Sequence, residues 1–375
     1  MFSVETREGF RQGVLKTGAG EIRTPFFMPD ATRAAVRGVM TNEIRESGTP
    51  ALVVNTYHLM LSPGAELINR AGGIHAFMNW DGPVLSDSGG YQVFSLIHRD
   101  PDMGRITEDG AEFRSVLDGS KHLLTPERSI RIQFDLGVDI MVVLDDPRPN
   151  DTSREEIETA VERSIRWAGR CREEYDRQVA ARGLSEETRP LLFGVVQGGP
   201  FPGLRTRCAK GLTKIGFDGY GFGGRHIDEE GKFMDEIVAH TASVIPDESV
   251  RFALGIGTPK DIVRAYRAGW DMFDCVIPTR EGRHGRLFRR KSQLTTYNSQ
   301  LTTVDFYETI NIKNGRFTED FTPIDPECDC PLCTNHTAAY LHHLFRVGDP
   351  LGNRLASLHN LRFYAELMRD LRGGS

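Results

Sequence analysis

Short apolar runs recur along the chain, and each ends at a polar residue or a glycine. Seven such runs span residues 51–55, 84–87, 140–145, 191–197, 219–224, 252–257 and 272–274. Continuous apolar runs of this length are typical of strands buried on both faces, as in a parallel sheet. Because the segments between them carry helical periodicity, the pattern predicts alternating strands and helices, and we expect a (β/α)8 TIM-type barrel.

The polar residues at the ends of these runs indicate one shared site. They are Asn55, Asp87, Asp145, Gln197 and Asp274. In a (β/α)8 barrel the carboxyl ends of the strands form the active-site face, so we expect these side chains to converge. Aspartate and asparagine also end strands as turn formers, but that explanation covers one or two of the positions better than all five.

Segments outside the runs predict helices and one irregular insertion. Residues 151–153 with Glu156 resemble a capping box, and the apolar spacing that follows predicts an outer barrel helix. The other expected elements are a short helix at 260–269, an inserted loop or short hairpin at 292–303, and closing amphipathic helices at 337–347 and 355–371.

Composition and charge narrow the class of protein. The chain has 375 residues, with 46 basic and 52 acidic side chains and a formal charge of −6, so a polyanion would have to bind a local basic patch. The first ten residues lack the apolar core of a signal peptide, and no run approaches the roughly 18 apolar residues of a membrane helix. We expect a cytoplasmic protein with no membrane association.

Three of the six cysteines crowd together as Cys328, Cys330 and Cys333, a spacing typical of a zinc site. A closed structural site needs four ligands, so we predict one structural Zn²⁺ per chain. Spacing alone does not choose the fourth ligand among His336, His342, His343 and His359. We expect the barrel to span residues 1–290, and the inserted loop, zinc-binding subdomain and closing helices to span 291–375.

The runs that end at Asp87 and Asp274 have neighbours suited to a planar ligand and to nucleic acid. Asp87 is followed by Ser88-Gly89-Gly90-Tyr91-Gln92, where glycines allow close backbone approach and Tyr91 offers a ring for stacking. Two carboxylates across a barrel mouth suit glycosyl transfer, with one as nucleophile and the other as proton donor and acceptor. Residues 280–291 hold six basic residues against one acid, which suits phosphates and unstacked bases, although a solvated loop explains Arg289, Arg290 and Lys291 equally well.

These motifs closely resemble the tRNA-guanine transglycosylases of the bacterial type. The matching segments, in order along the chain, are Asn55-Thr56-Tyr57-His58-Leu59, residues 85–92, Val196-Gln197-Gly198, residues 216–224, and Phe273-Asp274-Cys275 with Pro278-Thr279-Arg280. The resemblance covers nearly the whole chain. It implies an enzyme of queuosine biosynthesis that exchanges the wobble guanine of tRNA for a 7-deazaguanine, usually 7-aminomethyl-7-deazaguanine.

The resemblance also assigns roles to single residues. It implies that Asp274 attacks the anomeric carbon and that Asp87 acts as general acid and base. It implies a homodimer, because one tRNA would overrun a single subunit, and it places the fourth zinc ligand at His359. The other implied contacts are Tyr91, Gln92, Asp145, Gln197, Gly224 and Leu254 to the base, and Arg280, Arg283 and Arg286 to the anticodon loop.

The chain departs from the family pattern in three places. Asp145-Asp146-Pro147 replaces Asp-Glu-Cys, and Gly223-Gly224-Arg225-His226-Ile227-Asp228-Glu229 replaces Gly-Gly-Leu-Ala-Val-Gly-Glu in the strip that faces position 7 of the base. The stretch 289–309 is also longer than usual. Since backbone makes the family's contact at Arg225, we expect this side chain to point outward and the aminomethyl base to remain the substrate, with the cyano base or queuine as the alternative.

Two other classes of function compete with this interpretation. A barrel metallohydrolase needs several histidines at strand ends, and only His58 is available there. A non-catalytic subunit that binds tRNA or a deazaguanine is the stronger competitor, because the family includes such partners. The presence of both Asp87 and Asp274 favours an enzyme.

Overall fold

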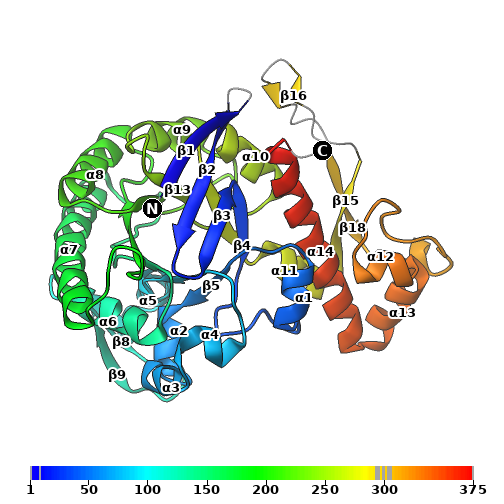
Figure 1. Cartoon of the computed structure of the whole chain (residues 1–375), viewed down its shortest axis with the longest axis horizontal. Helices are drawn as coiled ribbons and strands as arrows, with labels where there is room; N and C mark the ends of the chain where they lie inside the picture. The colour runs from blue at the N-terminus through cyan, green and yellow to red at the C-terminus, as the bar shows by residue number, and fades with distance from the viewer. Residues whose placement is uncertain (1, 8–9, 292–295, 298–299, 302–305, 374–375) are drawn as a thin grey trace.

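A parallel eight-stranded barrel forms the centre of the molecule (Figure 1). The computed structural model describes residues 2–7, 10–291, 296–297, 300–301 and 306–373. The strands follow the order β4-β14-β13-β12-β11-β10-β6-β5, and the backbone N–H of Ala31 donates to the carbonyl of Val53 at 2.7 Å, which joins the two edges. The barrel strands are β4 (Phe26–Pro29), β5 (Leu52–Asn55), β6 (Val84–Asp87), β10 (Ile140–Val142), β11 (Leu191–Val196), β12 (Gly219–Phe222), β13 (Val250–Ala253) and β14 (Met272–Cys275).

The barrel prediction is confirmed, with two corrections to its strands. All seven apolar runs overlap a barrel strand, but β13 begins at Val250, before the predicted start at residue 252. The buried Arg251 interrupts the apolar pattern there, and its guanidinium donates to the carbonyl of Ile245 and to Asp247. The eighth strand, β4, was not predicted, because its short apolar segment is bounded by Pro25 and Pro29 and resembles a turn.

Helices surround the barrel, and the long α7 begins at the predicted cap. The Ser153 hydroxyl accepts from the backbone N–H of Glu156 at 3.3 Å. The expected short helix is α10. The helices of this part are α1 (Thr41–Glu46), α2 (Thr56–Leu61), α3 (Ala65–Arg70), α4 (Gly73–Met78), α5 (Gly90–Arg99), α6 (Pro126–Leu136), α7 (Arg154–Ala181), α8 (Pro202–Ile215), α9 (Asp235–Ser243), α10 (Pro259–Arg267) and α11 (Ile277–Arg283).

Two small antiparallel sheets are added to the barrel. The sheet of β1 (Phe2–Arg7), β2 (Phe10–Thr17) and β3 (Gly20–Thr24) lies across one end of the barrel in Figure 1. Arg11 of this sheet donates to Asp271 at 2.8 Å and to the carbonyl of Ser249, both just before a barrel strand begins. This sheet therefore covers the amino-terminal ends of the barrel strands, and the mouth at their carboxyl ends stays open. The second sheet consists of β7 (Gly104–Ile106), β8 (Ala111–Arg114) and β9 (Lys121–Leu124).

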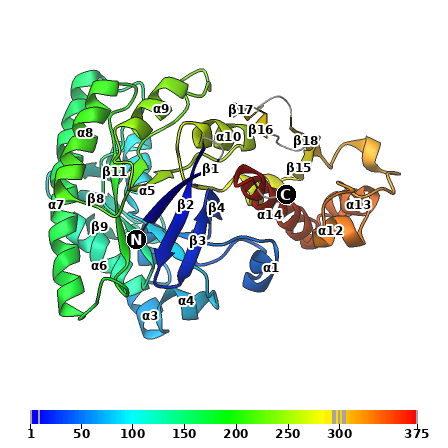
Figure 2. The same cartoon turned by 45° about the horizontal axis from the view of Figure 1, so that its top comes forward.

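The C-terminal region forms a second, smaller apolar core beside the barrel. Figures 1 and 2 show α12 and α13 on the side opposite α7 and α8. The last helix, α14, belongs to both parts, since Leu355 packs in the smaller core and Tyr364 in the barrel core. The elements here are β15 (Arg286–Arg290), β18 (Tyr307–Asn311), α12 (Pro331–Asn335), α13 (Ala338–Val347) and α14 (Pro350–Leu371).

The predicted insertion at 292–303 is described only in part. Within it, β16 (Thr296–Tyr297) pairs with β17 (Gln300–Leu301) as an antiparallel hairpin, and residues 292–295, 298–299 and 302–303 lie outside the described residues. Among the described helices, none combines the length and the apolar character that a membrane crossing requires.

Candidate active site

A cavity of about 480 Å³ opens at the carboxyl ends of the barrel strands. We call it the mouth cavity. All five polar residues that were predicted from the ends of the apolar runs line it: Asn55, Asp87, Asp145, Gln197 and Asp274. The parallel strands bring together side chains that are far apart in the sequence, as the barrel prediction required.

Asp87 ends β6 and is held by hydrogen bonds from two neighbouring segments. Its Oδ1 accepts from the backbone N–H groups of Thr56 at 3.2 Å and Gly89 at 3.0 Å, and its Oδ2 accepts from the Asn55 amide. Gly89 has a φ of +78°, and a Cβ there would lie 2.8 Å from the Tyr57 nitrogen, so this turn requires glycine. Burial raises the pKa of Asp87 to about 7 against these stabilising bonds. A carboxyl group with this pKa is suited to give and take a proton near neutral pH.

Asp274 lies in β14 and has fewer hydrogen-bond partners than Asp87 among the described residues. Its Oδ1 accepts from the backbone N–H of Gly255 at 2.8 Å. Burial raises its pKa to about 7, and the negative charge of Asp30 adds to the shift. A carboxylate that is half ionised near pH 7 and weakly solvated is a competent nucleophile.

Asp145 and Gln197 follow the neighbouring strands β10 and β11 and form another wall of the mouth cavity. The Gln197 amide donates to Asp145 Oδ2 at 2.6 Å, and burial raises the pKa of Asp145 to about 7. A Cβ at Gly223 would lie 2.4 Å from the Gln197 side-chain nitrogen, so glycine is needed for this approach. The wall offers an amide, a carboxyl group and the backbone of Gly224, which together can read the hydrogen-bonding edge of a planar base.

Apolar and aromatic side chains complete the cavity. Tyr91 is 58% exposed at the start of α5, and Leu254 follows β13. Both line the cavity, so both can cover the faces of a flat ligand. Gln92 lines it as well, and its Oε1 is buried with no hydrogen-bond partner among the described residues. This orphaned acceptor is available to a ligand N–H.

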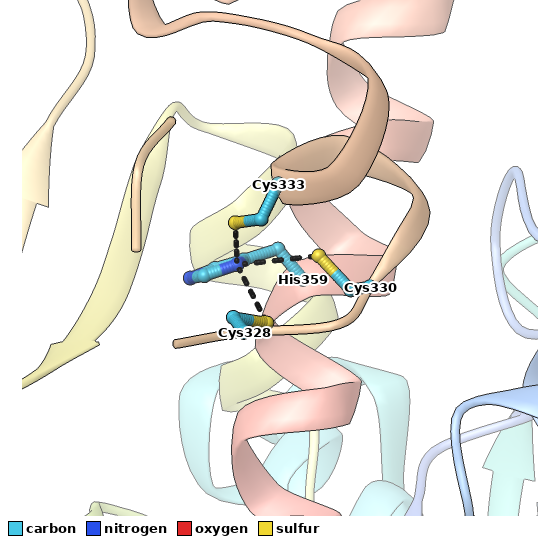
Figure 3. Close-up of side chains that lie close together, drawn as sticks. All are labelled: Cys328, Cys330, Cys333 and His359. Carbon is cyan, nitrogen blue, oxygen red and sulfur yellow. Dashed lines mark hydrogen bonds between the residues drawn. The ribbon is translucent and has the colours of Figure 1, made fainter. Parts of the chain in front are cut away.

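The three cysteines and His359 meet in the smaller core (Figure 3). We call them the Cys3His cluster. The Nδ1 atom of His359 lies 3.7, 3.5 and 3.3 Å from the sulfurs of Cys328, Cys330 and Cys333. Tetrahedral zinc, with Zn–S and Zn–N bonds of about 2.3 and 2.0 Å, places sulfur and nitrogen about 3.5 Å apart. The spacing of the cluster therefore fits a metal ion, and α14 selects one of the four candidate histidines.

The second nitrogen of His359 fixes the direction of the ring. Nε2 lies 2.7 Å from the carbonyl oxygen of Phe288, and since a carbonyl only accepts, Nε2 carries the proton. The lone pair of Nδ1 then faces the three sulfurs. The neighbouring Asn360 donates to the carbonyls of Pro278 and Arg286, both at 2.9 Å, and so fastens this part of α14 to the barrel end.

Comparison with known proteins places the chain in a family. The family model described as Queuine tRNA-ribosyltransferase matches residues 7–374. The chain belongs to the queuine tRNA-ribosyltransferase family. The protein of that name from Aliivibrio salmonicida is 42% identical over 362 residues, covering 96% of this chain and 89% of the relative. Relatives of the same name from Halothermothrix orenii and Shewanella piezotolerans are each 42% identical, and cover 97% and 99% of this chain and 89% and 92% of their own lengths.

Membership of the queuine tRNA-ribosyltransferase family makes the chain a pentosyltransferase enzyme and confirms the family resemblance. The arginines predicted to bind nucleic acid occupy different positions. Arg280 lines the mouth cavity, Arg283 is half-buried in the same helix, and Arg286 is exposed 3.1 Å from Glu281. Two other residues of the basic stretch are paired within the fold instead: Arg289 with Glu308 at 2.8 Å and Arg290 with Asp370 at 3.0 Å.

Two of the three departures from the queuine tRNA-ribosyltransferase pattern, at residues 145–147 and 223–229, lie at the mouth cavity. Asp146 is buried and pairs with Arg163 at 2.5 Å and with Arg148. Arg225 is exposed but still lines the cavity, and its carbonyl accepts from the Asn150 amide at 3.2 Å. Among the described residues, Glu229 is exposed and does not line the cavity.

Two residues that sequence reasoning missed support or enter the site. The fully buried Arg205 donates to the carbonyls of Val196 at 3.2 Å and Gly223 at 3.1 Å, and so ties together the ends of β11 and β12. Its position on the buried face of an amphipathic helix was the available signal. Asp30 follows β4 and lines the mouth cavity, but it was missed because β4 itself was missed.

Proposed function

We propose that this enzyme is a tRNA-guanine transglycosylase that exchanges the wobble guanine of tRNA for a 7-deazaguanine in queuosine biosynthesis. The observation that carries the proposal is that Asp87 and Asp274 line one cavity together with a wall that can read a base edge. A non-catalytic binding subunit has no need of two half-buried carboxyl groups with pKa values raised to about 7.

Asp274 acts as the nucleophile. Its carboxylate oxygen forms a bond to C1′ of the wobble ribose while the bond from C1′ to N9 of guanine breaks. The departing guanine takes up the proton that Asp87 holds. The incoming base then gives its N9 proton to Asp87, forms a bond to C1′, and releases Asp274 as a free carboxylate. The two half-reactions balance, and the exchange is ping-pong.

The remaining cavity residues hold the base. Asp145, Gln197 and the backbone at Gly224 bind its polar edge, and Gln92 accepts a further N–H. Tyr91 and Leu254 cover its two faces. Hydrogen-bonding groups and stacking surfaces arranged in this way select a purine-like ring over other planar ligands.

The tRNA anticodon loop binds across the mouth through Arg280, Arg283 and Arg286. The chain carries a net charge of −6, so the local arginines supply the phosphate contacts. A tRNA is wide enough to overrun one subunit, which supports a homodimer as the binding form. A tRNA substrate also places the activity in the cytoplasm.

The incoming base is 7-aminomethyl-7-deazaguanine. A cationic aminomethyl group is favoured by the carboxyl groups of the mouth cavity, whereas Arg225 opposes it. Because Arg225 is exposed, solvent screens its charge. The alternative base, cyano-substituted or queuine, is favoured by the position of Arg225 along the cavity lining and of Glu229 outside it.

The Cys3His cluster holds one structural Zn²⁺. All four ligands come from the protein and leave no open position, so the metal stabilises the fold and takes no part in the exchange.

One incubation tests the activity. The protein is mixed with unmodified tRNA and radiolabelled guanine, and label in the tRNA is measured. We expect stoichiometric incorporation at the wobble position, and none with a tRNA whose wobble guanine is replaced by adenine. Binding of tRNA without incorporation would contradict the proposal and favour the non-catalytic subunit.

A further inference from the structure

A third carboxylate, Asp30, lies between the two proposed reacting groups. In the barrel order, β4 lies between β14, which carries Asp274, and β5, which ends at Asn55 beside Asp87. Asp30 immediately follows β4, lines the mouth cavity and bridges to Val53 of β5. Its charge contributes, after burial, to the raised pKa values of both Asp87 and Asp274, so it is close to each of them.

Among the described residues, the hydrogen bonds to Asp30 reach only its Oδ1 atom. Oδ1 accepts from the backbone N–H of Thr32 at 2.6 Å and from the Thr32 hydroxyl. Within the described part of the chain, Oδ2 accepts no hydrogen bond, and Asp30 forms no ion pair. A half-buried carboxylate that lines a cavity and has one oxygen without a partner among the described residues can accept a hydrogen bond from a ligand there.

The position of the base determines which part of the nucleotide reaches Asp30. The base-reading wall comes from β10, β11 and β12, on the far side of the barrel from β4. With C1′ at Asp274, the sugar must lie on the side of β14, β4 and β5. Inside an RNA strand the 3′ and 5′ oxygens are esterified, so the 2′-hydroxyl is the one sugar group that can donate a hydrogen bond.

We propose that Asp30 accepts a hydrogen bond from the 2′-hydroxyl of the nucleotide whose base is exchanged, and so makes the site selective for ribose over deoxyribose. The inference rests on the proposed function and deepens it. A carboxylate suits this task because it only accepts, and because it repels the flanking phosphates that would otherwise enter the same space. Arg283, whose charge interacts with Asp30, lies on the proposed phosphate-binding side.

Asp30 is also a turn-forming residue, since it accepts from the backbone N–H two residues on. Two substitutions separate the turn from the proposed contact. Asp30→Asn keeps an oxygen for the Thr32 N–H but turns an amide donor toward the cavity, whereas Asp30→Ala removes both functions. A purely structural role predicts a normal Asp30→Asn enzyme.

The test is a cycle of two enzymes and two substrates. Anticodon stem-loops with guanosine or 2′-deoxyguanosine at the exchanged position are compared by kcat/KM for guanine exchange, in wild type and in Asp30→Asn. We expect wild type to favour the ribose substrate about 10- to 100-fold more strongly than Asp30→Asn does, as fits a charge-assisted hydrogen bond. The different intrinsic reactivity of deoxyribose cancels in this ratio.

An equal ribose preference in both enzymes would overturn the inference and leave the proposed function intact. Wild type that exchanges neither substrate would overturn the proposed function itself. Asp30→Ala is the second variant, and it should lose the preference as fully as Asp30→Asn. If it kept the wild-type preference with an unchanged Tm, the contact would be excluded.

Discussion

The carboxylates of the mouth cavity and the thiols beside α14 are both half-buried or buried ionisable groups, but their polar atoms are satisfied in different ways. In the Cys3His cluster every ligand atom faces the others, and His359 is fixed by a backbone carbonyl. In the mouth cavity, Asp274 has one side-chain hydrogen bond from the part of the chain that the structure describes, and burial raises its pKa to about 7. A set of ligands that closes around a metal adds folding free energy, whereas a carboxylate buried without a full set of partners costs folding free energy and keeps its reactivity.

The largest effect is expected at Asp274. Asp274→Asn removes the nucleophile but keeps an oxygen for the Gly255 N–H, so we expect the rate of guanine exchange to fall by about 1,000-fold or more. Asp87→Asn should be similarly inactive, and filter binding should show tRNA affinity within a few-fold of wild type for both variants. Substantial turnover by the Asp274→Asn enzyme would show that the nucleophile is a different residue.

Loss of a cluster ligand should act on stability instead of chemistry. We expect purified protein to hold one zinc per chain by elemental analysis. His359→Ala should lose that metal and lower the Tm by about 5 °C or more. The matched control is His343→Ala, because His343 is exposed on α13 and should keep both the metal and the Tm. If His359→Ala kept its zinc and His343→Ala lost it, the fourth ligand would be His343 and the assignment of His359 would be wrong.

The cost of burying Asp274 should appear in the pH dependence of stability. The unfolded chain releases this proton near pH 3.8 and the folded chain near pH 7, so the folded state binds more protons between these values. The Asp274 carboxyl group therefore destabilises the fold increasingly as the pH rises through this window. Denaturation should find Asp274→Asn more stable than wild type by about 1–4 kcal/mol at pH 8 and equally stable at pH 4. A variant less stable at pH 8 would refute this.

The smallest effect is expected at the edge of the mouth cavity. Because Arg225 is exposed, Arg225→Leu should change the choice among the aminomethyl, cyano and queuine bases by less than about fivefold. Wild type should prefer the aminomethyl base in direct competition. A wild-type preference for the cyano base or queuine that Arg225→Leu reverses would show that the guanidinium reaches into the pocket.

The sequence predicted those parts of the fold in which local pattern and tertiary environment agree. Seven strands were recognisable because buried parallel strands are apolar throughout, and the Ser153 cap because its partner is three residues away. β4 could not be predicted, since three apolar residues between prolines carry no periodicity. Because β4 was not predicted, Asp30 at its end was not predicted as a site residue either, although Asp30 lines the same cavity as the residues that were predicted.

The zinc ligands also show that a local sequence pattern predicts neighbouring residues but not the side chains that tertiary packing brings to them. The spacing of the three cysteines is local and was sufficient to predict a metal site. The histidine is brought in by α14, and the residue that orients it, through the Phe288 carbonyl, lies 71 positions away in the sequence. Contacts between residues so far apart in the sequence arise from tertiary packing. The cysteine spacing therefore could not choose the fourth ligand among the four histidines, and the family resemblance was needed to select His359.

The central claim, that Asp274 bonds to the ribose during exchange, is tested most directly by locating the covalent adduct. Enzyme and tRNA are incubated with a slow-reacting base, denatured and digested, and the peptides are analysed by mass spectrometry. We predict ribose-linked RNA on the peptide that contains Asp274, and no adduct with Asp274→Asn. An adduct on the Asp87 peptide, or one that persists in Asp274→Asn, would contradict the account.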